Sequence, residues 1–128
     1  MNKKIMIIDD DADQVISIKE KIESAYPDIE IEFILGYDGT FIKDYYLKNP
    51  PPNAIIIDYF MPVMNGYSTA KFIRKYWSKD VHIILITLDA DLSDIKGQDY
   101  DLFDEFILKP ITSKSITKAL YDIIEEDV

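Results

Sequence analysis

The sequence predicts an α/β protein built on a parallel β-sheet with helices on its faces. Short isoleucine-rich runs, typical of strands buried on both faces of a parallel sheet, occupy residues 4–8, 54–57, 82–86 and 106–108. Segments with helical spacing of apolar residues separate these runs. Such an alternation of strands and helices is typical of parallel sheets with crossover helices.

Length and composition favour a single domain. The chain has 128 residues, of which 48% are hydrophobic, so we expect one domain over residues 1–128. The formal net charge is −10 and the basic residues are scattered, so we expect no direct binding to nucleic acid or to a membrane. The absence of cysteine excludes disulfides and thiolate metal sites. No apolar stretch approaches the roughly 20 residues of a membrane span or forms a signal-peptide core, so we expect a cytoplasmic protein.

The first strand and helix have the clearest pattern. The strand at residues 4–8 runs into Asp9, Asp10 and Asp11, and apolar residues at helical spacing follow. We expect Asp11 or Asp13 to cap this helix, because a short acidic side chain accepts hydrogen bonds from the free N–H groups of a first turn. Pro27 ends the helix.

The remaining elements follow from local patterns. Between residues 29 and 33 apolar residues alternate with glutamate, which predicts a half-exposed edge strand. Residues 41–48 have a helical pattern, and so do residues 68–77 after an Asn65-Gly66 turn. The aspartate-rich stretch 89–101 is a short helix or a loop. Ser113 caps a last helix with an apolar inner face.

These elements predict five β-then-α units. Right-handed crossovers leave few ways to order the strands. A half-exposed second strand fits the edge of the order 2-1-3-4-5, which is that of flavodoxin-like, doubly wound sheets. The predicted fold is therefore a five-stranded parallel sheet with five helices, the fourth of them short or irregular.

Carboxylates, a hydroxyl and an ammonium group follow the predicted strands. Asp9 and Asp10 follow the first strand and Asp58 the third, so their side chains converge at the carboxyl edge of the sheet. Like charges a few ångströms apart repel by roughly 1 kcal/mol in water and several-fold more near a protein surface. A divalent cation offsets this repulsion, and oxygen ligands alone select Mg²⁺ or Ca²⁺. Thr87 and Lys109 end two further strands, which makes mere helix capping a weaker explanation of the aspartates.

The order of these motifs resembles one known family. Asp9-Asp10-Asp11, the segment from Asp58 to Gly66 (Asp-x-x-Met-Pro-x-Met-x-Gly), Ile86-Thr87 and Lys109-Pro110 follow one another as in the receiver domain of two-component response regulators. The resemblance covers essentially the whole chain. It implies a signalling domain that becomes phosphorylated, and not a metabolic enzyme.

The resemblance also implies a role for each matched residue. Asp58 would accept the phosphoryl group. Asp10, Asp58 and the backbone carbonyl of Phe60 would bind Mg²⁺ directly, and Asp9 would bind it through water. Thr87 and Lys109 would contact phosphoryl oxygens, and the Lys109-Pro110 peptide would be cis. Thr87 and Phe106 would form the switch, in which the Phe106 ring moves inward when Thr87 moves.

The implied partners are a histidine kinase or a histidine phosphotransfer protein, together with an output domain or effector that the sequence does not identify. A phosphorylation-dependent homodimer is compatible with the resemblance, and the sequence leaves the oligomeric state open. Phosphorylation adds roughly −1.5 to −2 charge and several acceptor oxygens, to which Thr87 and Lys109 can donate hydrogen bonds.

Four features depart from the family pattern. Leu88 stands where a small residue is usual, and its side chain could narrow access to Asp58. Phe60 is large and apolar, so it would shield the phosphoryl group from water and slow its hydrolysis. Leu102-Phe103 replaces the usual Gly-Ala, and the stretch 89–101 differs from the usual fourth helix, which belongs to the family's output face.

Three alternatives remain open at this point. Residues 9–20 match some positions of an EF-hand calcium loop, although Gln14 replaces its glycine. Asp11-x-Asp13, Thr87 and Lys109 imitate motifs of haloacid-dehalogenase-like phosphatases, but no acidic pair follows Lys109 soon enough. A pseudo-receiver that only docks partners would share the fold without the phosphorylation chemistry.

Overall fold

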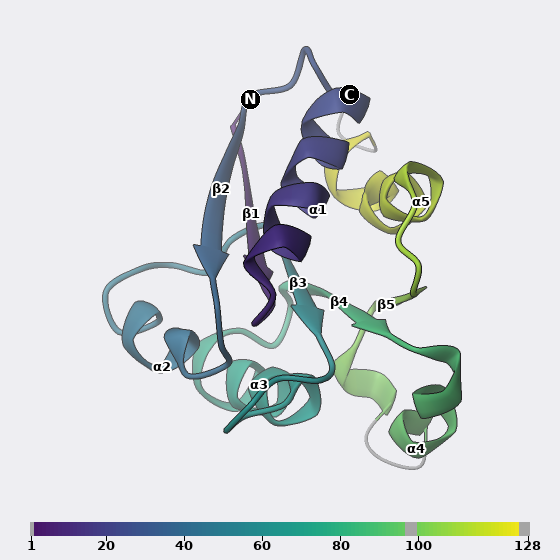
Figure 1. Cartoon of the computed structure of the whole chain (residues 1–128). Coiled ribbons are helices and arrows are strands. Elements are labelled where there is room, and N and C mark those ends of the chain that lie inside the picture. Colours follow the sequence, from purple (N-terminus) through teal and green to yellow (C-terminus); the bar gives the residue numbers. More distant parts are fainter. Residues whose placement is uncertain (1, 97–99, 126–128) are drawn as a thin grey trace.

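A single parallel sheet forms the centre of the molecule (Figure 1). The computed structural model describes residues 2–96 and 100–125. Five strands lie in the order β2-β1-β3-β4-β5, which confirms the predicted flavodoxin-like topology. Their bounds are β1 Lys3–Ile8, β2 Ile31–Gly36, β3 Ala54–Asp58, β4 His82–Thr87 and β5 Glu105–Leu108.

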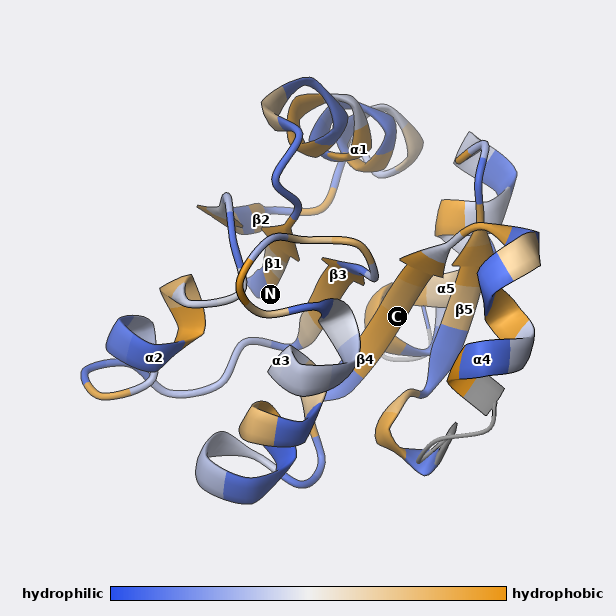
Figure 2. Ribbon diagram, turned by 60° about the horizontal axis from the view of Figure 1, so that its bottom comes forward, coloured by the Kyte–Doolittle hydropathy of each residue, from blue (hydrophilic) through white to orange (hydrophobic). Residues whose placement is uncertain are grey.

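Helices cover both faces of this sheet (Figures 1 and 2). Within residues 2–96 and 100–125, the five α-helices are α1 Ala12–Ala25, α2 Phe41–Tyr45, α3 Gly66–Phe72, α4 Leu92–Lys96 and α5 Ser113–Ile124. A π-helical turn, Ile73–Trp77, continues α3, and the 3₁₀ turns Asp89–Asp91 and Tyr100–Leu102 flank α4. The fourth helix is therefore short, as predicted.

Alternating side chains of the strands divide the core into two layers. Ile5 and Ile7 of β1 point into a cluster that includes α1 and α5. Met6 and Ile8 point to the opposite face, where they pack in a cluster with residues of α2, α3 and α4. Figure 2 shows the hydrophobic residues concentrated on the central strands. This burial on both faces explains why the strand sequences are continuous apolar runs.

The edge strand is displaced from its predicted position. Residues 29–33 were expected to form it, whereas β2 spans Ile31–Gly36. Backbone pairing with β1 sets this register, since Ile31 lies opposite Lys3 and Gly36 opposite Ile8. The later part of β2 does not alternate between apolar and polar residues. Ile34 and Leu35 are both apolar, because Ile34 packs in one layer of the core and Leu35 in the other.

Side-chain caps fix where the helices begin. The Asp11 carboxylate accepts hydrogen bonds from the N–H groups of Asp13 and Gln14 at the start of α1, as predicted. The cap of α5 is Thr112 rather than Ser113, because the extended backbone of Thr112 lets it form a reciprocal capping box with Ser115. Asn65 caps α3 through the N–H of Ser68, so the predicted Asn65-Gly66 turn is in fact a helix start.

Arg74 links the strands at the amino-terminal edge of the sheet. Its guanidinium, on the π-helical turn, donates hydrogen bonds to the carbonyl oxygens of Leu102, Lys79 and Val81. It also pairs with the Asp104 carboxylate at 3.0 Å. The same carboxylate oxygen accepts a hydrogen bond from the N–H of Ile83, so a single arginine connects the beginnings of β4 and β5.

We predict that Arg74→Ala lowers the free energy of unfolding by about 2–4 kcal/mol, because it removes the guanidinium donors from the half-buried carbonyl oxygens of Leu102 and Val81. Chemical denaturation measures this change. Lys79→Ala serves as the control, since it removes an exposed cation from the same loop, and it should alter stability by no more than about 0.5 kcal/mol. Equal stabilities of the two variants would contradict the assigned role of Arg74.

Candidate phosphoacceptor site

The functional side chains come from the carboxyl ends of neighbouring strands. Ile8 of β1 lies opposite Ile57 of β3, so the next residues along each strand, Asp9 and Asp58, lie side by side. Thr87 ends β4 beside them, because its neighbour Ile86 lies opposite Asp58. Lys109 follows β5 directly. The parallel sheet thus gathers residues from distant parts of the chain at one edge.

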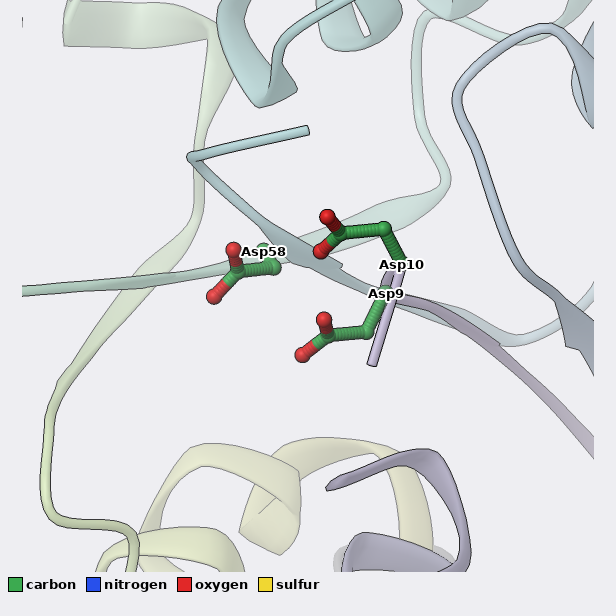
Figure 3. A group of neighbouring side chains, drawn as sticks. All are labelled: Asp9, Asp10 and Asp58. Atoms are coloured by element: carbon green, nitrogen blue, oxygen red, sulfur yellow. The ribbon is translucent and has the colours of Figure 1, made fainter. Parts of the chain in front are cut away.

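Three carboxylates form the centre of this site (Figure 3). One oxygen each from Asp9, Asp10 and Asp58 lie within 4.8 Å of one another. Asp9 and Asp58 are buried residues, with only 2% exposure each, whereas Asp10 is exposed. The predicted convergence of the three aspartates is therefore present.

An open pocket of roughly 440 Å³ lies over the carboxylates. Its lining residues are Asp9, Asp10, Asp11, Gln14, Asp58, Phe60 and Lys109. The side chain of Phe60 is 56% exposed, which suits a residue at the rim of the pocket. Sequence reasoning did not place Asp11 and Gln14 in this lining. The N-terminal turn of α1, which follows Asp9 and Asp10 directly, brings them there.

Burial makes the charge of Asp9 costly. It raises the pKa of this carboxyl to about 7, and the negative charge of Asp58 adds to the rise, while the N–H of Asp11 lowers it. The Oδ1 atom accepts that hydrogen bond at 3.0 Å, but Oδ2 is buried with no hydrogen-bond partner. A buried carboxylate oxygen without a partner is rare in folded proteins, and a bound cation would satisfy it.

Asp58 and Lys109 form an ion pair inside the pocket. The Lys109 Nζ atom lies 2.7 Å from Asp58 Oδ1. Burial raises the pKa of Asp58, and the ammonium group of Lys109 opposes this rise. Burial also lowers the pKa of Lys109, but the Asp58 carboxylate outweighs it, so the pKa of Lys109 is raised overall. Lys109 therefore remains an ammonium group at neutral pH.

Neither of the predicted switch residues, Thr87 and Phe106, lines the pocket. Thr87 is buried, and its hydroxyl donates to the Leu88 carbonyl at 3.3 Å. The Thr87 carbonyl accepts the N–H of Lys109 at 2.9 Å, which connects the ends of β4 and β5. Phe106 is half-buried in the layer of α2, α3 and α4, with its ring 5.6 Å from that of Phe103.

The structure also locates two of the departures from the family pattern. Phe60 does line the pocket, in agreement with a shielding role. Leu88 is 46% exposed and is not among the lining residues, so the structure does not support the expectation that its side chain narrows access to Asp58. The Lys109-Pro110 peptide is cis, as the resemblance implied.

The loop between β3 and α3 is held close to Asp58. A Cβ atom on Gly66 would lie 2.8 Å from the Asp58 carbonyl oxygen, so only glycine fits there. The Gly66 N–H donates to the Tyr59 carbonyl at 2.9 Å and closes the loop. Within the loop, Val63 has a left-handed backbone with φ 68° although it is β-branched and 93% exposed. The loop thus contains local backbone strain next to the site.

The donor set of the acidic cluster fits a hard divalent cation. Its ligand atoms are carboxylate oxygens, which favour Mg²⁺ or Ca²⁺ over softer metals. The partnerless Oδ2 of Asp9 gives such an ion an oxygen that the protein leaves free. An EF-hand loop is excluded, because the residues that would form it are helical from Ala12 onward.

Comparisons with known proteins agree with this geometry. The family model of the response regulator receiver domain matches residues 5–121. This chain belongs to the response regulator receiver domain family. The match and the shared fold do not favour the phosphatase alternative or the docking-only alternative.

Individual relatives of this receiver domain differ in length. A probable transcriptional regulator ycf27 of Porphyridium aerugineum is 31% identical over 95% of this chain but only 48% of its own length. A chemotaxis protein CheY homolog of Campylobacter jejuni is 26% identical, with 94% and 92% covered. This chain thus spans about half the length of the ycf27 relatives and nearly all of the CheY homolog.

A solved structure shares the fold of this receiver domain. It is the receiver domain of the sensor histidine kinase PA1611 of Pseudomonas aeruginosa, described with a magnesium ion coordinated in its active-site cleft. The two superpose with a TM-score of 0.79 at 21% identity, covering 97% of this chain and 98% of the other. Among the helices of the described residues, none is long and apolar enough to cross a membrane.

Asp9→Asn tests the electrostatics of the acidic cluster. Without divalent cations at pH 8, we expect the free energy of unfolding to rise by about 1–3 kcal/mol, because the substitution removes a buried charge beside Asp58. Mg²⁺ binding should weaken at the same time. Chemical denaturation and a Mg²⁺ titration measure the two effects, and Asp28→Asn on the exposed surface is the control.

The pH dependence gives a second readout of the same prediction. Folded Asp9 holds its proton up to about pH 7, well above the ordinary carboxyl value of 3.8, so the native state binds more protons than the unfolded state between these values. Stability of the metal-free protein should therefore fall as pH rises through this window, and fall less in Asp9→Asn. Parallel pH profiles of the two proteins would contradict the prediction.

Proposed function

We propose that this receiver domain accepts a phosphoryl group on the Asp58 carboxylate and so switches a protein–protein interaction surface. The donor is the phosphohistidine of a histidine kinase or of a histidine phosphotransfer protein. The observation that carries the proposal is the ion pair of Asp58 with Lys109, 2.7 Å apart, in an open pocket that contains two further carboxylates. An ion pair with only a structural role would not need an open pocket or two further carboxylates beside it.

The transfer itself requires little from the protein beyond position and charge. A carboxylate oxygen of Asp58 attacks phosphorus, the phosphorus–nitrogen bond of phosphohistidine breaks, and its electron pair stays on the imidazole nitrogen. Asp58 reacts as the carboxylate that Lys109 stabilises, so no general base is needed. The ammonium group of Lys109 is within reach of phosphoryl oxygens and offsets their negative charge.

The site also suits Mg²⁺. Asp10, Asp58 and the Phe60 carbonyl would hold the ion directly, with Asp9 bound through water. When bound, Mg²⁺ neutralises the charge that gathers between the carboxylates and the incoming phosphoryl group. The PA1611 receiver domain, described with a magnesium ion coordinated in its active-site cleft, supports Mg²⁺ as the ion.

Thr87 and Phe106 would transmit the change. The Thr87 hydroxyl makes a long hydrogen bond to the Leu88 carbonyl, which a phosphoryl oxygen can replace with a stronger, charge-assisted one. Because Lys109 N–H is bonded to the Thr87 carbonyl, both residues would respond together at the ends of β4 and β5. Phe106 of β5 would then turn inward. The output domain or effector that reads this change, and any phosphorylation-dependent homodimer, belong to the same proposal.

We further infer that one domain spans residues 1–128 and that it works in the cytoplasm as a signalling protein rather than a metabolic enzyme. Its match to the receiver family over residues 5–121 supports the first inference. A phosphoacceptor with a single nucleophile takes up one phosphoryl group, whereas a phosphatase turns over many equivalents of substrate.

Intact mass spectrometry with acetyl phosphate and Mg²⁺ tests the proposed phosphorylation. We expect wild type and the control Asp28→Asn to gain one phosphoryl group each, and Asp58→Asn to gain none, because the amide is not nucleophilic. Absence of an adduct on folded wild type would favour the docking-only alternative. An adduct on Asp58→Asn would place the acceptor elsewhere, and release of many equivalents of phosphate by Asp58→Asn would support a phosphatase with another nucleophile.

Phe60→Ala tests the shielding role of the pocket rim. We expect hydrolysis of the phosphorylated domain to become several-fold faster, because water gains access to the phosphoryl group while the backbone carbonyl of residue 60 is retained. The decay of the phosphorylated mass after removal of acetyl phosphate measures the rate. Val63→Ala removes an exposed apolar side chain from the same loop without changing the pocket lining, and it should decay like wild type.

A further inference from the structure

A second groove lies on α3, away from the phosphoacceptor pocket. It has a volume of roughly 380 Å³ and shares no lining residue with the pocket over Asp58. We call it the α3 groove. Its lining residues are Lys43, Met64, Tyr67, Ser68, Lys71, Phe72, Lys75 and Tyr76. The proposed phosphorylation chemistry uses none of these side chains.

The charge of the α3 groove is opposite to that of the molecule. The chain has a formal net charge of −10, yet Lys43, Lys71 and Lys75 line the groove and no carboxylate does. Within the part of the chain that the structure describes, none of these three ammonium groups forms an ion pair with an acidic residue. All three lysines are exposed. The groove is therefore an uncompensated positive patch on an acidic protein.

Aromatic rings lie against two of these three lysines. Lys71 Nζ lies 5.7 Å from the centre of the Tyr67 ring, and Lys75 Nζ lies 5.2 Å from that of Tyr76. Phe72 packs against Tyr76 with ring centres 4.9 Å apart. Tyr46, which follows the end of α2, also packs against the Phe72 ring. Such rings offer apolar contact area with little loss of side-chain freedom, which is why interfaces are rich in them.

The spacing of these residues suits a helical occupant. Tyr67, Lys71 and Lys75 recur every four residues and form one ridge. Ser68, Phe72 and Tyr76 form the neighbouring ridge in the same way. Two such ridges enclose the kind of shallow groove into which a ridge of a second helix packs. The π-helical turn Ile73–Trp77 carries the last residue of each ridge, and π-helical turns are frequent at functional sites.

We propose that the α3 groove docks an acidic amphipathic helix of another protein. Glutamate or aspartate side chains of that helix meet the three lysines, and its apolar side chains pack on Phe72, Tyr76 and Met64. A short helix is favoured over an extended polyanion, since the acidic remainder of the domain repels nucleic acid or an anionic membrane. A second copy of this chain is disfavoured for the same reason. The proposal goes beyond phosphorylation and does not depend on it.

The test uses two synthetic helical peptides of equal length that carry the same leucine and phenylalanine stripe. One has glutamate on its flanks and the other lysine. NMR titration of the unphosphorylated domain should show that the acidic peptide binds and that the shifted amides cluster at residues 67–76 and around Lys43. The basic peptide should bind at least tenfold more weakly. Absence of binding by the acidic peptide, or shifts elsewhere, would overturn the proposal.

Charge-reversed variants give the matched control. The double variant Lys71→Glu/Lys75→Glu should weaken binding of the acidic peptide at least tenfold. Lys114→Glu/Lys118→Glu makes the same charge change at the same spacing on exposed positions of α5 and should leave binding within twofold. If Lys71→Glu/Lys75→Glu does not fold, as judged by circular dichroism, Lys71→Gln/Lys75→Gln takes its place. Equal losses in the groove and α5 variants would indicate attraction by net charge alone and would refute the site.

Analytical ultracentrifugation and vesicle flotation test two other possible occupants of the α3 groove, a second copy of this chain and an anionic membrane. We expect the domain alone to show no association that depends on Lys71 and Lys75, and no binding to vesicles that contain phosphatidylserine. Self-association abolished by Lys71→Glu/Lys75→Glu would assign the groove to a second copy and overturn the proposal, and vesicle binding abolished by the same change would assign it to a membrane.

Discussion

The repulsion between buried carboxylates is the constraint on which the site depends. Asp9 and Asp58 are both nearly inaccessible to water, and a third carboxylate, Asp10, lies against them. Like charges at such distances cost several-fold more near a protein surface than in water. Lys109 supplies one compensating charge, and the unpaired oxygen of Asp9 marks where another fits. The negative charge that Lys109 leaves uncompensated favours a cation over any second anion at this edge of the sheet.

The loop from Tyr59 to Asn65 lies between the two surfaces of interest. Phe60 lines the pocket over Asp58, and Met64 lines the α3 groove. Both ends of the loop are tightly packed, since a Cβ atom on Gly39 would lie 2.6 Å from the Met64 carbonyl and one on Gly66 would meet the Asp58 carbonyl. The strained Val63 lies between these fixed points. This one loop therefore contributes a lining residue to each of the two surfaces.

The fold and the acidic centre could be predicted from the sequence because simple rules govern them. Isoleucine-rich runs predict buried parallel strands, and the carboxyl ends of parallel strands share one edge, which places Asp9 beside Asp58. The register of β2 could not be predicted, because backbone pairing with β1 decides it. The role of Arg74 could not be predicted either, since most of its partners are backbone carbonyl oxygens, which every residue type has. The direction of the Thr87 hydroxyl and the place of Gln14 depend on local geometry in the same way.

Lys109 follows all three acids in the sequence, which has a consequence for synthesis on the ribosome. Residues 9, 10 and 58 emerge first, so the nascent chain can assemble β1 and β3 with their acids well before the ammonium group exists. A buried carboxylate without its partner is strongly destabilising. Until β5 has left the exit tunnel, the growing domain would have to keep Asp58 in contact with water or with a dissolved cation. The last strand to emerge thus completes the electrostatic balance as well as the sheet.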